Sequence, residues 1–69
     1  MSSISKRLGK KIKLARVEKD MSQSNLAHTA GIDSSHIGKI ERGELNITVV
    51  TLYRLAEALK CSPTMLLPE

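Results

Sequence analysis

Residues 23–42 read QSNLAHTAGIDSSHIGKIER. Small and apolar residues occur in this stretch where two short helices that cross over a tight turn need them. Ala27 is small at the point where the two helices would approach each other, and Gly31 lies where the chain must reverse. The pattern predicts one helix over 23–30 and a second over 34–42.

Capping residues frame both predicted helices. Ser22 and Asp33 precede them, and their side-chain oxygens can accept hydrogen bonds from N–H groups of the first helical turn. Gly43 follows the second helix and is expected to stop it. Ile37 and Ile40 stand three residues apart within that helix and are expected to point inward.

Three further helices are predicted on either side of this pair. The first covers 4–19 and has an apolar stripe at helical spacing, formed by Ile4, Leu8, Ile12 and Ala15. The fourth covers 49–60 after the cap candidate Thr48, with a stripe of Leu52, Leu55, Ala56 and Leu59. A brief fifth helix covers 63–67, with Ser62 as its cap and Pro63 at its first position. The sequence therefore predicts an all-α, compact five-helix domain.

Length and composition limit the classes of protein that this chain can be. A chain of 69 residues holds one small core, so residues 1–69 are expected to form a single domain. No apolar run approaches the roughly 18 residues that cross a bilayer, and no secretory signal is evident, which predicts a cytoplasmic protein without membrane contact. The single cysteine, Cys61, cannot form an internal disulfide and is expected to be a buried, inert thiol. It shares no zinc-ligand spacing with His28 and His36, so no metal or other cofactor is expected.

The positive charge is concentrated at one end of the chain. The formal net charge is +4, and residues 1–19 hold seven lysines and arginines against one carboxylate, Glu18. This bias is typical of a solvated helix face and also of a surface that contacts phosphates, and charge alone leaves both open. The chain has one tyrosine and no tryptophan or phenylalanine, which disfavours a nucleic-acid site built on stacked aromatic rings. If nucleic acid is the partner, duplex DNA is favoured over single strands.

Several motifs together give the chain a resemblance to a known family. Residues 8–67 resemble the phage-repressor/Cro-like, or XRE-type, helix-turn-helix DNA-binding domains. The resemblance rests on LGKKI at 8–12, Arg16, MSQSNLA at 21–27, AGI at 30–32, IGKIERG at 37–43, LAEAL at 55–59 and MLL at 65–67.

The resemblance implies a lambda-repressor-like fold in which helices two and three form the helix-turn-helix and the helix over 34–42 enters the major groove. The residues then expected to contact bases are Ser34, Ser35, Lys39 and His36. Those expected to contact phosphates are Gln23, Arg42, Asn46 and Thr48, the last of which is also a cap candidate. Arg16 and Glu41 resemble the family's internal ion pair, which ties the first helix to the recognition helix.

The chemistry of the residues implied to contact bases suits the major groove. Ser35 and Lys39 are four residues apart and share one helix face. A lysine can donate to O6 and N7 of guanine, whereas a serine hydroxyl discriminates weakly between bases. Gly38 lies between them, and it is interpreted either as letting the backbone approach DNA or as a tolerated glycine on an exposed face.

Three positions depart from the family pattern. Glu44 is acidic in a loop that often faces phosphates, which predicts weakened or redirected contacts with the DNA backbone. Lys60 replaces a glycine that commonly follows the fourth helix, and Cys61 stands where valine or isoleucine is usual. The Lys60 departure leaves the end of the fourth helix poorly defined.

A homodimer on an inverted-repeat operator is expected, because a single domain reads too few base pairs for adequate specificity. The candidate interface comprises Pro63, Met65, Leu67 and Val50, and an enlarged core within a monomer is the alternative for this apolar surface. The expected function is a sequence-specific transcriptional regulator of the Cro-like repressor or restriction-modification controller type, with no small-molecule ligand. The alternative is a protein-interaction module, such as an antitoxin, that holds a protein partner. No catalytic triad, carboxylate pair or phosphate-cradling loop supports an enzyme.

Overall fold

The computed structural model describes residues 3–68 of the chain and contains helices but no strands within them. The elements are α1 (Ile4–Glu18), α2 (Gln23–Ala30), α3 (Ser34–Glu41), α4 (Val49–Ala58) and the 3₁₀ helix η1 (Pro63–Leu66). The all-helical prediction is therefore confirmed.

The predicted count of five α-helices is wrong, because the last element is a short 3₁₀ turn. Its bonds span three residues, as in the hydrogen bond from the Met65 amide to the Ser62 carbonyl at 2.9 Å. A four-residue segment that begins with Pro63 is too short to develop the α-helical bonding pattern. Three other predicted helices extended one or two residues too far at their C-terminal ends.

The helix boundaries follow from local chemistry. The predicted N-caps are confirmed, since an amide in the following turn donates to each of the side chains of Ser22, Asp33, Thr48 and Ser62. Gly31 ends α2 with a φ of 70°, as predicted. Lys60 has a φ of 54°, so it adopts after α4 the left-handed conformation that a glycine would supply at lower cost.

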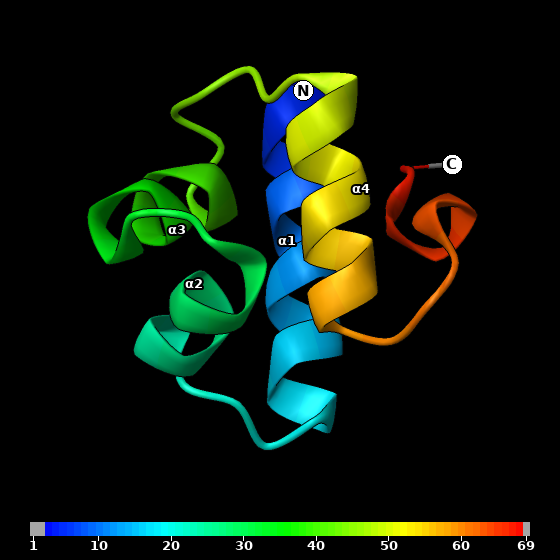
Figure 1. Cartoon of the computed structure of the whole chain (residues 1–69). Coiled ribbons are helices and arrows are strands. Elements are labelled where there is room, and N and C mark those ends of the chain that lie inside the picture. Colours follow the sequence, from blue (N-terminus) through cyan, green and yellow to red (C-terminus); the bar gives the residue numbers. More distant parts are fainter. Residues whose placement is uncertain (1–2, 69) are drawn as a thin grey trace.

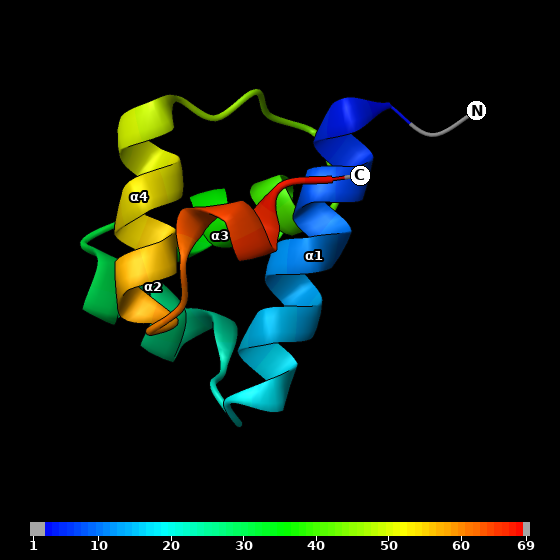
Figure 2. The same ribbon diagram turned by 90° about the vertical axis from the view of Figure 1, so that its right-hand side faces the viewer.

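The elements surround one core (Figures 1 and 2). α1 and α4 form two sides of the molecule, and η1 lies between them on one face while α2 and α3 lie on the opposite face. The side chains that are fully buried come from every element: Ile12, Leu26, Ile37, Leu55, Leu59 and Leu66. The core therefore separates α3 from η1. Within residues 3–68, no helix combines the length and apolar character required for a membrane span.

Two sequence expectations about burial are wrong. Ile4 belongs to the predicted stripe of α1 but is 69% exposed, because the first residue of α1 lies beyond the end of the core. Ile12 of the same stripe is fully buried, and Leu8 packs partly buried against the core. Cys61 is half-buried at the core edge rather than enclosed.

The backbones of α1 and α3 approach each other closely at Gly9. A Cβ atom added to Gly9 would overlap the carbonyl oxygen of Ile40 and would lie 2.7 Å from that of Glu41. Real Cβ atoms do not approach backbone oxygens at such distances, so only glycine fits here. The absence of a side chain at this position sets how closely α3 packs on α1.

Candidate nucleic-acid interface

The exposed face of α3 carries three polar side chains at helical spacing. Ser35, Lys39 and Arg42 stand at i, i+4 and i+7, and all three are exposed. Ile37 and Ile40 on the opposite side are buried, as predicted. α3 therefore presents a hydroxyl, an ammonium and a guanidinium group outward, and Ser34 is also exposed at its start.

Ser35 is tied to the cap of α3. Its amide and its hydroxyl both donate to Oδ1 of Asp33, each at 3.0 Å. The backbone hydrogen bond, and then the hydroxyl bond, hold the pKa of Asp33 below its usual value. Because the hydroxyl proton is used, Ser35 is set up to accept a hydrogen bond, for example from the amino group of adenine or cytosine.

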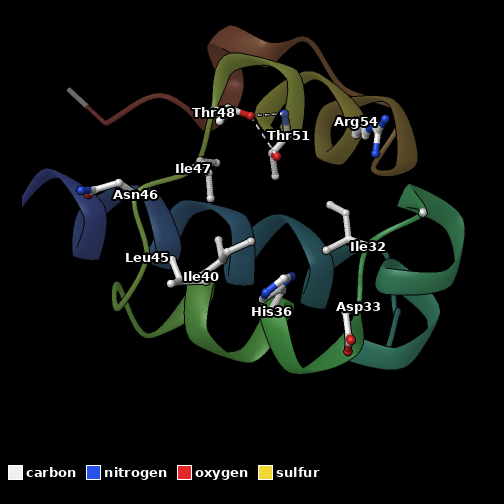
Figure 3. Close-up of a pocket in the computed structure, with 11 residues that line it drawn as sticks. Ile32, Asp33, His36, Ile40, Leu45, Asn46, Ile47, Thr48, Thr51 and Arg54 are labelled. Atoms are coloured by element: carbon white, nitrogen blue, oxygen red, sulfur yellow. Dashed lines mark hydrogen bonds between the residues drawn. The ribbon is translucent and has the colours of Figure 1, made fainter.

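His36 lies apart from the other residues implied to contact bases. It is four residues from the buried Ile40 and lines a groove between α3 and α4 (Figure 3). Asn46 and Thr48 line the same groove from the connecting loop. The structure thus places His36 with two of the residues implied to contact phosphates rather than with Lys39.

Both loop residues already make hydrogen bonds within the protein. The hydroxyl of Ser5 donates to Oδ1 of Asn46 at 2.6 Å, which joins the loop to the start of α1. The hydroxyl of Thr48 accepts from the Thr51 amide and donates to the Thr51 hydroxyl, each at 3.1 Å (Figure 3). Asn46 retains its amide donors for a phosphate, whereas Thr48 is committed to capping α4.

Arg16 and Glu41 form an ion pair that is largely withdrawn from solvent. Nε and Nη2 of Arg16 donate to the two carboxylate oxygens at 2.7 and 3.1 Å, and Nη1 donates to the Met21 carbonyl at 2.8 Å. The two side chains are 11% and 3% exposed. The pair joins the end of α1 to the end of α3, which fixes the orientation of the exposed α3 face.

Gln23 contributes to the same network. Its Nε2 donates to Oε1 of Glu41 at 3.0 Å, so the first residue of α2 is linked to the buried carboxylate. An amide nitrogen carries two hydrogens, and the second remains available to a phosphate. This link between Gln23 and Glu41 was missed by sequence reasoning, because residues 18 positions apart carry no local signal of contact.

Gly38 is buried, which excludes one of its two interpretations, a tolerated glycine on an exposed face. The other interpretation, approach of the backbone to DNA, stays a prediction. A Cβ atom at this position would lie 3.2 Å from Nη1 of Arg42 and 3.8 Å from Oε1 of Gln23. The guanidinium of Arg42 therefore lies back along α3 and covers the space that a side chain at Gly38 would occupy.

Arg42 is also paired with Glu44, one of the departures from the family pattern. Nε and Nη2 of Arg42 donate to the two carboxylate oxygens at 2.7 and 3.4 Å. These hydrogen bonds raise the pKa of Arg42 and lower the pKa of Glu44, so both groups are charged at neutral pH.

The residues expected at the dimer interface fall in two places. Met65 is 66% exposed and lines a groove with Leu14 of α1, whereas Val50 is 61% exposed and lines another groove with Val49 and Tyr53 of α4. Leu67 is 45% exposed, and Pro63 is half-buried. Sequence reasoning missed Val49 and Tyr53, whose outward position becomes evident only once α4 is packed on the core.

Comparison with known proteins gives the chain its family. The Helix-turn-helix family model matches residues 12–66. The control protein C.SmaI of Serratia marcescens is 38% identical over 60 residues, covering 87% of this chain and 71% of that protein. An uncharacterised HTH-type transcriptional regulator of Sinorhizobium fredii is 37% identical over 57 residues, covering 83% of this chain and 74% of that protein.

A similar solved structure is the restriction-modification controller protein C.AhdI from Aeromonas hydrophila. Its TM-score is 0.87 and its sequence identity is 36%, over 88% of this chain and 92% of that one. This similarity agrees with the fold expected from the sequence motifs. The chain therefore belongs to the helix-turn-helix family.

Proposed function

We propose that this helix-turn-helix protein is a transcriptional regulator that binds duplex DNA sequence-specifically, with α3 in the major groove. The observation that carries the proposal is the exposed face of α3, where Ser35, Lys39 and Arg42 lie in one line while the buried Arg16–Glu41 pair holds the helix in place. Its relatives support this class of function, since they are named as control proteins and transcriptional regulators.

Roles within the interface follow from exposure and bonding. Ser34, Ser35 and Lys39 contact base edges, and His36 reaches the DNA from the flank of α3. Phosphate contacts come from Gln23 and Asn46 at the margins of the interface, and from Arg42 when a phosphate displaces Glu44 from it. The capping role of Thr48 makes its contribution small. The protein acts in the cytoplasm as an autoregulator of the controller type or as a repressor.

Lys39 is expected to carry the strongest base contact. Selection of duplexes from a random pool at near-physiological salt should enrich an inverted repeat whose half-site centres lie about 10 base pairs apart. Lys39→Ala should then lower the affinity for the selected site roughly tenfold or more, because a lysine contact to guanine is lost. Lys10→Ala removes the same charge from the exposed side of α1 and should have a smaller effect. No enrichment by the folded wild-type protein would contradict the proposed function.

The homodimer is part of the same proposal. Both α3 helices of a two-fold dimer must face one DNA duplex, and η1 lies on the opposite face of the domain from α3 (Figures 1 and 2). An interface centred on α4, at Val50 with Val49 and Tyr53, satisfies this geometry better than one centred on η1. Met65, which lines a groove with Leu14 of α1, then lies outside the centre of the interface.

Val50→Glu is expected to dissociate the dimer without unfolding the domain, because the side chain is 61% exposed and the change places a charge in an apolar contact. Sedimentation equilibrium measures the result, with circular dichroism to verify the fold. Val17→Glu is the matched control, since Val17 is 52% exposed on α1, outside the proposed interface. Dissociation by Val17→Glu but not by Val50→Glu would place the interface elsewhere.

A further inference from the structure

Glu44 is held beside Arg42 by the backbone as well as by the ion pair. Gly43 ends the α3 region with a φ of 76°, and the Glu44 amide donates to the Lys39 carbonyl at 2.9 Å. The Gly43 amide donates to the Ile40 carbonyl at 3.0 Å, so the chain turns back on the last turn of α3. The position of the carboxylate is therefore set by a defined helix-terminating turn.

The carboxylate occupies one of the forked edges of the guanidinium through which a phosphate can bind. Glu44 accepts from Nε and Nη2 of Arg42, which together form one bidentate edge. Nη1, the remaining nitrogen, faces the surface over Gly38 and makes no hydrogen bond to the rest of residues 3–68. Phosphate and carboxylate oxygens bind a guanidinium in the same forked geometry, so they compete for this edge.

Glu44 also lies within the electrostatic influence of a second cation on α3, Lys39. The positive charge of Lys39 contributes to lowering the pKa of the Glu44 carboxyl, after the larger effects of Arg42. The carboxylate thus sits among the cations of the face that is proposed to meet DNA. Both members of the Arg42–Glu44 pair are more than half exposed, at 58% and 52%, so a duplex can reach them.

We propose that Glu44 is an intramolecular competitor of DNA phosphate for Arg42 and thereby limits the affinity of this protein for duplex DNA. The inference rests on the proposed DNA-binding function. While the pair is intact, Arg42 contributes no net charge at this end of α3, and a phosphate reaches the forked Nε–Nη2 edge only by displacing the carboxylate. The effect is uniform across DNA sequences, because a phosphate contact carries no direct base readout.

Glu44→Gln is expected to release Arg42 for one additional phosphate contact. Affinity for a duplex of random sequence at low salt should rise about threefold to tenfold, within the range of effects of exposed ion pairs and single phosphate contacts. The slope of log K against log salt concentration should become steeper by about 0.9, the value for one added contact. The selected operator and a random duplex should gain similarly.

Glu18→Gln is the matched control, because it also removes one exposed carboxylate but lies on α1, in a groove with Met65. Comparing the DNA affinities of Arg42→Gln and Arg42→Gln/Glu44→Gln gives the effect of removing the Glu44 charge when Arg42 is absent. The difference from the effect in the wild-type background is the part due to the Arg42–Glu44 pair. The gain from Glu44→Gln should shrink in the Arg42→Gln background to the size seen with Glu18→Gln. Titrations of a fluorescent duplex at four salt concentrations measure all four variants and the wild type.

Two results would overturn the inference. The first is a Glu44→Gln protein whose affinity and salt slope match those of Glu18→Gln. The second is a gain that persists in full when Arg42 is already glutamine, since Glu44 would then act by simple repulsion of DNA. Failure of both the folded wild-type protein and Glu44→Gln to bind any duplex at low salt would instead overturn the proposed function itself, and this inference with it.

Discussion

Arg16→Ala is expected to destabilise the fold by about 3 kcal/mol, the scale for breaking a buried ion pair. The Glu41 side chain is only 3% exposed in the wild-type structure, and the variant removes its guanidinium partner together with the hydrogen bond to the Met21 carbonyl. The Glu41 carboxylate would then keep one of its two side-chain donors, Gln23. A domain of this size has only about 3–10 kcal/mol of stability, so the variant should lie close to unfolding at room temperature.

Urea unfolding followed by circular dichroism measures this loss. Arg7→Ala is the matched control, since it removes an exposed arginine from the same helix, and its effect should stay within about 0.5 kcal/mol. The double variant Arg16→Met/Glu41→Gln should recover much of the stability, because no buried charge is left unpaired. If Arg16→Ala unfolds at the same urea concentration as Arg7→Ala, the pair is not a structural link.

Gly9→Ala is expected to destabilise the protein by about 1–3 kcal/mol, the cost of overpacking a tightly packed site. Helix propensity alone predicts the opposite sign, since alanine stabilises a helix interior by up to about 1 kcal/mol relative to glycine. Steric overlap between α1 and α3 decides the sign, because the new methyl group would overlap the carbonyl oxygens of Ile40 and Glu41. These oxygens belong to the backbone of α3, which cannot rotate away as a flexible side chain can. The same displacement of α3 should weaken DNA binding.

Gly38→Ala is the control with the same chemical change in a helix. Its Cβ atom would lie 3.2 Å from Nη1 of Arg42, which is the end of a flexible, exposed side chain that can shift. Stability should therefore stay unchanged or rise by up to about 1 kcal/mol. Thermal melts of the two variants provide the comparison, and a Gly9→Ala protein as stable as Gly38→Ala would show that α1 and α3 can separate without cost.

The helices and their limits could be predicted from the sequence because they depend on interactions between near neighbours. The capping oxygen of Ser22 accepts a hydrogen bond from an amide only three residues away. Gly31 ends α2 through its own backbone conformation, a positive φ. The same holds for the face shared by Ser35 and Lys39, since helical geometry alone places residues i and i+4 together. The motifs distributed over residues 8–67 added the family, which the match to the helix-turn-helix model confirms.

The bonding partners of the polar interface residues required the folded chain. Ser5 meets Asn46, and Gln23 meets Glu41, across separations at which no sequence pattern predicts contact. Gly38 illustrates the difficulty, because one of its two interpretations from sequence required exposure, whereas the residue is buried and Nη1 of Arg42 lies beside it.

The sequence by itself determined helices α1 to α4, the N-caps Ser22, Asp33 and Thr48, the inward residues of α3 and the outward line of Ser35 and Lys39. All of these depend on contacts between residues a few positions apart. Only the tertiary structure decided which of the remaining groups are available to a partner. It exposed Ile4, shortened the last helix to a 3₁₀ turn, and paired Arg42 with Glu44. These outcomes depend on where the core ends and how the chain turns after α3, which are properties of the packed molecule and not of any local stretch.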